Sequence, residues 1–228
     1  MKTITYRILF LSIVFLMPET FQAQDWANLD HFAKANSKLA APAKNENRVV
    51  FMGNSITIGW LNSRPAFFKG KPYVNRGISG QTTPQMVLRF RQDVIDLKPK
   101  VVVILAGTND IAGNTGPSTL EMIMDNIKSM AELATSNEIK VILSSVLPAY
   151  DYPWRPGLEP NIKIPKLNAM IKAYALEKGH IYLDYFSAMA DERNGLPKKY
   201  AHDEVHPTSA GYQVMEPLVE AAIQKALR

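Results

Sequence analysis

The stretch of sequence that decides the fold is VVVILAGTND, residues 101–110. Its first six residues form an unbroken apolar run, which is typical of a parallel-sheet strand with both faces covered by helices. The run ends in the short polar cluster Gly107-Thr108-Asn109-Asp110, and a buried strand that ends in this way usually delivers polar side chains to a site. The stretch therefore predicts a central strand with functional residues at its carboxyl end.

Four further strand-like segments complete a set of five, at residues 48–52, 73–76, 139–146 and 181–184. Amphipathic helix-like segments lie between them, one starting with Thr83 as its cap and one with the capping-box pattern Ser118-x-x-Glu121. Two more cover residues 161–178 and the segment after Pro207. This alternation requires crossover connections and hence a parallel sheet with helices on both faces. We therefore predict an α/β fold, a three-layer α/β/α sandwich around a five-stranded parallel sheet.

The composition is that of one globular domain. Of 228 residues, 46% are hydrophobic and 21% are charged, and no repeat or linker divides the segment from residue 48 to 228. The formal net charge is +5, but the lysines are scattered and no basic stripe or recognition motif indicates nucleic-acid binding. The chain has no cysteine, so neither a disulfide framework nor a lipid-modified cysteine is available. The sequence indicates no oligomeric state.

The first 23 residues have the order of a secretory signal peptide. Two basic residues precede an apolar run over residues 8–17, which is shorter than the roughly 20 residues that a helix needs to cross a bilayer. We therefore predict export to the periplasm or exterior, with no stable membrane span after cleavage. Because Phe21 stands where a small residue is preferred, an uncleaved anchor is the alternative. Residues 24–47 are expected to form a polar, helical lead-in.

Four short motifs carry the candidate chemistry: Gly53-Asn54-Ser55, Gly77-Ile78-Ser79-Gly80, Gly107-Thr108-Asn109-Asp110 and Asp203-Glu204-Val205-His206. Each one alone has an ordinary explanation as a turn, a cap or a structural histidine. Together they supply what a serine esterase needs: a nucleophilic hydroxyl, donors for a developing oxyanion, a general base and a carboxylate that orients the base. The first three motifs follow predicted strands, and ligands bind beyond the carboxyl ends of strands in such sheets.

The motifs resemble those of the SGNH hydrolases, also called the GDSL esterase/lipase family, which are named for the Ser, Gly, Asn and His of four sequence blocks. The resemblance implies that Ser55 is the nucleophile, that Ser55, Gly80 and Asn109 form the oxyanion hole, and that Asp203 and His206 form the acid–base pair. It also implies the flavodoxin-like strand order 2-1-3-4-5. The chain reads Gly-Asn-Ser-Ile where the family usually has Gly-Asp-Ser-Leu, which leaves the serine in place.

Two other residues are alternative acid–base groups. His202 adjoins the last motif but has no carboxylate three residues before it, and Asp184 at the end of the last predicted strand suits a capping or turn role. The four histidines are dispersed and no cysteine is present, so no zinc-type spacing occurs. We therefore predict catalysis without a metal or a cofactor.

Three aromatic residues and one arginine, expected at the same edge of the sheet as the motifs, are candidates for substrate binding. They are Tyr150, Trp154 and Arg155 in the loop after the fourth predicted strand, and Trp60 near the first motif. The loop residues could stack on a sugar or bind an anionic group, or they could simply pack a proline-stiffened loop. Trp60, with Phe67 and Phe68, could line an acyl pocket or belong to the core.

These observations predict an exported serine esterase that acts on small-molecule or glycan esters and releases short acyl groups, above all acetyl, from carbohydrates. One alternative is a lipase, lysophospholipase or thioesterase that accepts longer acyl chains. The alternative from another class is a catalytically silent glycan-binding module that keeps the fold. The intact set of Ser, Gly, Asn, Asp and His argues against the binding module.

Overall fold

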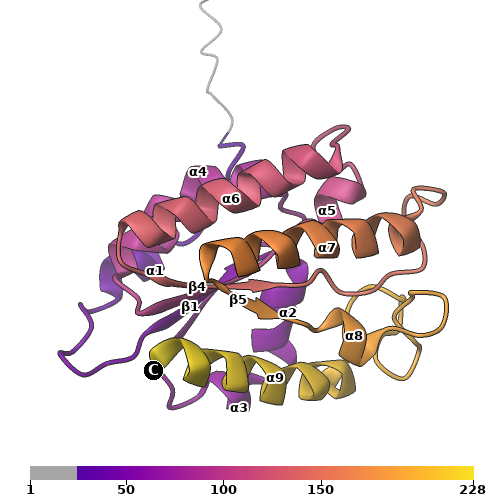
Figure 1. The fold of residues 1–228 in the computed structure, drawn as a ribbon. Helices are drawn as coiled ribbons and strands as arrows, with labels where there is room; N and C mark the ends of the chain where they lie inside the picture. The colour runs from indigo at the N-terminus through magenta and orange to yellow at the C-terminus, as the bar shows by residue number, and fades with distance from the viewer. Residues whose placement is uncertain (1–24) are drawn as a thin grey trace, which may run out of the picture.

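The computed structural model describes residues 25–228, and the predicted signal peptide lies outside them. The domain is built on five parallel strands in the order β2-β1-β3-β4-β5, which confirms the predicted fold and strand order (Figure 1). The strands are β1 (Val49–Gly53), β2 (Tyr73–Gly77), β3 (Val101–Leu105), β4 (Lys140–Ser144) and β5 (Ile181–Leu183). Their register aligns the carboxyl ends at one edge, because Gly53 lies beside both Gly77 and Leu105.

Helices cover both faces of the sheet (Figure 1). One face packs against α4 (Thr83–Asp93), α6 (Leu120–Ser136) and α7 (Pro160–Lys178), and the other against α2 (Ser55–Ser63) and α9 (Ser209–Leu227). Shorter elements are α3 (Pro65–Phe68), the 3-10 turn η1 (Ile95–Leu97), α5 (Thr108–Ile111) and α8 (Phe186–Met189). Among the helices of residues 25–228, none combines the length and the apolar character needed to span a bilayer.

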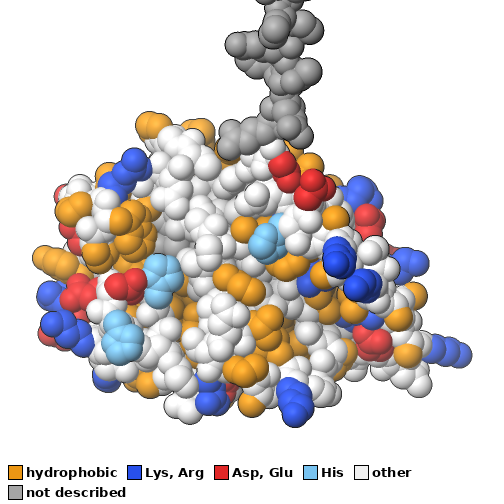
Figure 2. Space-filling view, turned by 180° about the vertical axis from the view of Figure 1, so that it is seen from behind, with side chains coloured by type: hydrophobic (Ala, Val, Ile, Leu, Met, Phe, Trp, Pro, Cys, Tyr) orange, Lys and Arg blue, Asp and Glu red, His pale blue; other side chains and the backbone are white. Residues whose placement is uncertain are grey.

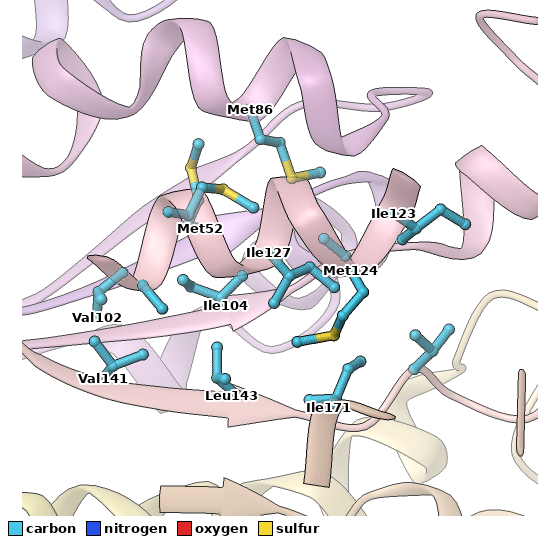
Figure 3. Packing of buried hydrophobic residues seen from close by; sticks show 14 of the residues in the cluster. Met52, Met86, Val102, Ile104, Ile123, Met124, Ile127, Val141, Leu143 and Ile171 are labelled. Carbon is cyan, nitrogen blue, oxygen red and sulfur yellow. The ribbon is translucent and has the colours of Figure 1, made fainter. Parts of the chain in front are cut away.

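Alternate side chains of each central strand enter different cores, since successive residues of a strand point to opposite faces. Val102 and Ile104 of β3 pack with Met86 of α4 and Ile127 of α6 (Figure 3). The odd-numbered residues of β3 belong to the second core, beneath α2 and α9. Both faces of β3 are therefore buried, which explains why its sequence contains no polar residue.

Two helices start with a cap one residue away from the predicted one. Thr82 caps α4 because the hydroxyl of Thr83 donates to the buried carboxylate of Asp110, at 2.6 Å between Oγ1 and Oδ1. Thr119, and not Ser118, caps α6 through its side-chain oxygen. The positions of both helices agree with the hydrophobic pattern, whereas the identity of the capping hydroxyl depends on neighbouring groups.

The lead-in is helical only over α1 (Ala33–Lys38), with turns on either side, rather than helical throughout. The backbone carbonyl of Trp26 accepts a hydrogen bond from the side chain of Gln85 at 2.6 Å, and that of Ala27 accepts one from Gln81 at 2.7 Å. These two carbonyls accept hydrogen bonds from side chains and therefore take no part in the backbone hydrogen bonds of an α-helix. The segment therefore runs in turns against the start of α4.

Charged side chains are dispersed over the surface. On the face of the domain drawn in Figure 2, Lys and Arg lie mainly toward the margins and are interspersed with Asp and Glu. Some cations of the described residues are paired, as Arg64 is with Glu216 at 2.8 Å. The positive charge on this face is spread out and does not form a continuous stripe.

Candidate active site

Ser55 is the first residue of α2 and lies just beyond the carboxyl end of β1. The side-chain oxygen of Asn54 caps this helix by accepting the N–H of Ile56 at 3.1 Å, so the unusual asparagine of the motif has a structural role. Gly53 is required by close packing, because a Cβ there would lie 2.0 Å from Oγ1 of Thr57. The Ser55 hydroxyl thus sits at the positive end of a helix dipole, which favours negative charge nearby.

A chain of hydrogen bonds links Ser55 to an imidazole and a carboxylate from the other end of the sequence. Ser55 Oγ lies 3.0 Å from His206 Nε2, and His206 Nδ1 lies 2.6 Å from Asp203 Oδ2. The side chains of His206 and Asp203 are 41% and 42% exposed, so the imidazole is held in place yet reachable from solvent. This geometry allows a proton to pass from the hydroxyl to the imidazole while the carboxylate orients the ring.

The carboxylate is positioned by the turn that follows it. Glu204 adopts left-handed backbone geometry (φ 62°), which turns the chain so that Asp203 Oδ1 accepts the N–H groups of Val205 at 3.1 Å and His206 at 2.7 Å. Partial burial raises the pKa of the Asp203 carboxyl, but the hydrogen bonds from His206 and Val205 outweigh burial and hold that pKa below its usual value. The carboxylate is therefore ionised at neutral pH.

Gly80 lies on the loop that follows β2, and Asn109 lies in α5, the short helix that follows β3. Gly80 has left-handed backbone geometry (φ 78°), which glycine adopts without steric cost. The side-chain nitrogen of Asn109 donates to the backbone carbonyl of Gln81 at 2.9 Å and ties α5 to the loop after β2. An amide nitrogen carries two N–H groups, so one remains for another acceptor.

A buried arginine joins β1 and β2, the two strands that lead to Ser55 and Gly80. Arg89 of α4 is 0% exposed, and its Nη2 donates to the carbonyls of Gly53 at 3.1 Å and Arg76 at 2.9 Å. Its Nη1 donates to the equally buried carboxylate of Asp93 at 2.9 Å, and its Nε donates to the side chain of Gln81. The guanidinium thus links the carboxyl-terminal parts of β1 and β2.

Sequence reasoning missed Arg89 and Gln81, although one signal was present. Arg89 falls three residues after Met86 and one before Phe90, within the apolar stripe of a predicted helix. A charged residue on a core-facing stripe is buried only when its donors are satisfied, which points to a specific structural task. No comparable signal marks Gln81.

The candidate loop after β4 lies partly at the site. Trp154 is 48% exposed, and its ring centroid lies 5.9 Å from that of His206. Arg155 Nη1 donates to the carbonyls of Ala112 and Gly113, both at 2.7 Å, which fastens the loop to the segment after α5. Tyr150 stacks instead under the guanidinium of Arg193 at 4.5 Å.

Trp60 does not reach the site. It is 2% exposed and its ring is stacked between Phe67 and Tyr212, at centroid distances of 4.9 and 5.6 Å. Trp60 lies four residues after Ile56 on α2, so both side chains point to the same face of the helix, toward the sheet. The prediction that Trp60 contacts the substrate is therefore wrong, and Trp60 is a core residue.

The alternative acid–base groups occupy other positions. His202 is exposed, and the Asp184 carboxylate accepts the N–H of Ser187 at 3.0 Å and its hydroxyl at 2.7 Å, in the first turn of α8. Asp184 therefore has the capping role that its sequence position suggested. Across residues 25–228, no group of three or more His, Asp or Glu side chains could hold a metal ion.

The site can be compared with known proteins. The profile of the GDSL-like lipase/acylhydrolase family matches residues 51–214. A solved structure of a GDSL-like lipase from Bacteroides thetaiotaomicron is 51% identical with a TM-score of 0.85, over 88% of this chain and 98% of that one. The chain is also similar over 93 residues, at 36% identity, to an uncharacterized lipoprotein of Bacillus subtilis. That match covers 39% of this chain, and the chain spans only 38% of the lipoprotein.

Two more distant relatives have named activities. A platelet-activating factor acetylhydrolase IB subunit alpha2 from Rattus norvegicus is 24% identical over 89% of this chain and 88% of its own length. An acetylxylan esterase from Geobacillus stearothermophilus is 26% identical over 62% of this chain and 67% of its own length. From the family match and the close structural likeness, we conclude that this chain belongs to the GDSL-like lipase/acylhydrolase (SGNH hydrolase) family and is an ester hydrolase.

Proposed function

We propose that this chain is an exported serine esterase that releases acetyl and other short acyl groups from carbohydrate esters through an acyl-enzyme on Ser55. The observation that carries this proposal is the relay from Ser55 Oγ to His206 Nε2 at 3.0 Å and from His206 Nδ1 to Asp203 at 2.6 Å. These distances are short enough for proton transfer in the resting enzyme.

The first half of the reaction transfers the acyl group to the enzyme. Ser55 Oγ attacks the ester carbonyl carbon while His206 Nε2 takes the serine proton, and Asp203 stabilises the imidazolium without taking a proton itself. The negative oxygen of the tetrahedral intermediate accepts hydrogen bonds from the N–H groups of Ser55 and Gly80 and from the free amide N–H of Asn109. The bond between the carbonyl carbon and the alcohol oxygen then breaks, and His206 protonates the leaving alcohol.

The second half returns the enzyme to its starting state. A water molecule gives a proton to His206 and attacks the acyl carbon, and the same donors hold the second oxyanion. Collapse of this intermediate releases the carboxylic acid and returns the proton to Ser55. Access of water is provided by the partial exposure of His206.

The placement of the aromatic residues supports a short acyl group. Trp60, Phe67 and Phe68 are 2%, 7% and 7% exposed and fill the core under α2 and α9. They are therefore not available to line a channel for a long acyl chain. Two of the relatives are named for acetyl groups on different alcohols, which supports acetyl as the acyl part.

Export is the part of the proposal that depends on residues 1–23. The order of basic, apolar and polar residues supports it, and a relative named as a lipoprotein is consistent with it. Deleting residues 2–23 should leave the protein inside the cell in a fractionation experiment, whereas the full chain should appear outside the cytoplasm with a shortened N-terminus. Recovery of the intact N-terminus in a membrane fraction would favour the uncleaved anchor.

The reaction is tested with p-nitrophenyl acetate, butyrate and octanoate beside an acetylated oligosaccharide. We expect the acetyl esters to react fastest and a fluorophosphonate to label Ser55. Ser55→Ala and His206→Ala should each abolish hydrolysis with little change in the thermal midpoint, and His202→Ala, a control on an exposed neighbouring histidine, should keep activity. A preference for octanoate would favour a lipase, and a wild-type protein without label or turnover would indicate a binding module.

A further inference from the structure

A polar cavity of about 620 Å³ opens beside the loop that follows β2 and carries Gly80. Gly80, a proposed oxyanion donor, forms part of its wall together with Gln81, so a ligand in the cavity would lie beside the proposed oxyanion hole. The cavity is unusual in taking two tryptophans from distant parts of the chain, Trp26 of the lead-in and Trp154 of the loop after β4. Its other lining residues include Asn28, Asn114 and Arg155.

Trp26 is held at this cavity by buried side chains. Its carbonyl accepts from Gln85, and the carbonyl of Ala27 accepts from Gln81, while Gln81 and Gln85 are only 2% and 9% exposed. The backbone is therefore fixed, yet the indole of Trp26 remains 44% exposed. Because its backbone is already fixed, Trp26 loses less conformational entropy when a ligand stacks on it than a residue of a mobile segment would.

Trp154 is held in an equally firm way. Its ring packs at a centroid distance of 5.3 Å from Tyr152, which is fully buried and whose hydroxyl donates to the carbonyl of Thr108 at 3.0 Å. The bonds of Arg155 to two backbone carbonyls fix the next residue of the loop. The cavity therefore has two exposed aromatic faces on rigid supports, one of them adjoining His206.

The chemistry of the lining selects one class of ligand. A sugar ring presents an apolar face of C–H groups and a rim of hydroxyls, which suit indole faces and the amide groups of Asn28 and Asn114 respectively. A long acyl chain would instead require a continuous apolar wall. We propose that this cavity binds the sugar ring that carries the ester, with the indole of Trp26 stacking on that ring. This inference rests on the proposed function.

The test compares a sugar ester with a substrate that lacks the sugar. For Trp26→Ala we expect KM for an acetylated xylo-oligosaccharide to rise about tenfold, as an aromatic contact of about 1.4 kcal/mol would give, while kcat is retained. Hydrolysis of p-nitrophenyl acetate should stay within about twofold, because that ester does not use the stacking face. Trp26→Phe should restore part of the loss. Leu176→Ala, which removes a 69% exposed side chain on α7, is the control and should change neither substrate.

A second variant keeps the inference testable if Trp26→Ala fails to fold. Asn28 has left-handed backbone geometry (φ 54°), so Asn28→Gly removes the amide without backbone strain and should also raise KM for the sugar ester alone. If wild type hydrolyses both substrates and the Trp26 and Asn28 variants match it on both, the sugar site is refuted and the esterase stands. If Trp26→Ala instead weakens only octanoate hydrolysis, the cavity binds acyl chains and the inference is refuted. If the wild type hydrolyses neither ester, the proposed function itself is refuted.

Discussion

The replacement of Arg89 by methionine tests whether a buried guanidinium supports the catalytic loops. Arg89 and Asp93 are both 0% exposed, so the substitution leaves a carboxylate in the core without its cation. Breaking a buried ion pair in this way typically costs about 3–5 kcal/mol. The carbonyls of Gly53 and Arg76 lose a donor as well. This cost is a large fraction of the roughly 5–15 kcal/mol by which a domain is stable.

Urea denaturation followed by circular dichroism measures the loss. The matched control is Arg91→Met on the same helix, where the arginine is exposed and the change should stay within about 0.5 kcal/mol. The double variant Arg89→Met/Asp93→Leu removes both charges and should recover most of the stability lost in the single variant. The single variant, where folded, should also lose up to about 100-fold in kcat on p-nitrophenyl acetate, because the strands that lead to Ser55 and Gly80 are no longer linked.

Three results would each refute a part of this reasoning. A loss below about 1 kcal/mol in Arg89→Met would mean that the pair is not desolvated as the burial indicates. A double variant no more stable than the single one would mean that the uncompensated Asp93 carboxylate is not the source of the cost. An unchanged kcat in a destabilised but folded variant would show that Arg89 supports the fold and does not position the loops.

Asp203→Asn should lower kcat by about 10,000-fold with KM little changed, because the imidazole of His206 is then held in the wrong tautomer; an effect under tenfold in steady-state kinetics would contradict the assignment. Asn109→Ala should lower kcat by about 100- to 1,000-fold, as loss of one oxyanion donor does, and a change confined to KM would exclude that role. The pKa of Asp203 is lowered from its usual value in the folded protein, so its contribution to stability is present above about pH 4 and is lost as the pH falls through the lowered folded pKa. Urea midpoints of wild type and Asp203→Asn should therefore converge in acid, and a constant difference would contradict the lowered pKa. Hydrolysis should persist in excess EDTA, since the Ser55 relay needs no metal; loss of activity with recovery on adding a divalent ion would overturn this view.

The sheet was predictable because its signal is strong and local. An uninterrupted apolar run such as residues 101–106 is stable as a strand only when both of its faces are covered. The existence of β3 and its neighbouring strands therefore follows from the local hydrophobic pattern. The order of the strands came from the family resemblance carried by the motifs. The caps Thr82 and Thr119 were missed by one residue, because adjacent hydroxyls compete for the same role and tertiary contacts, such as that of Thr83 with Asp110, decide between them.

The surroundings of the site were harder to predict than its motifs. Trp60 follows the first motif and Tyr152 lies in the loop after β4, but the burial of each depends on which face of its element meets the sheet or the next loop. The contribution of Trp26 to the cavity depends on glutamines more than fifty residues away that hold its backbone. Contacts of that range have no periodic signature in the sequence, so they became visible only in the folded chain.

Ser55 and His206, the proposed nucleophile and base, are separated by 151 residues, the former after the first strand and the latter after the last. A partly folded intermediate in which the edge strand has not docked cannot complete the proton relay and is inert, even if the region around Ser55 is already native. Ester cleavage consequently appears only when all the strands of the sheet, including the last one, have docked. Turnover measured during refolding would time the final docking step without any added probe.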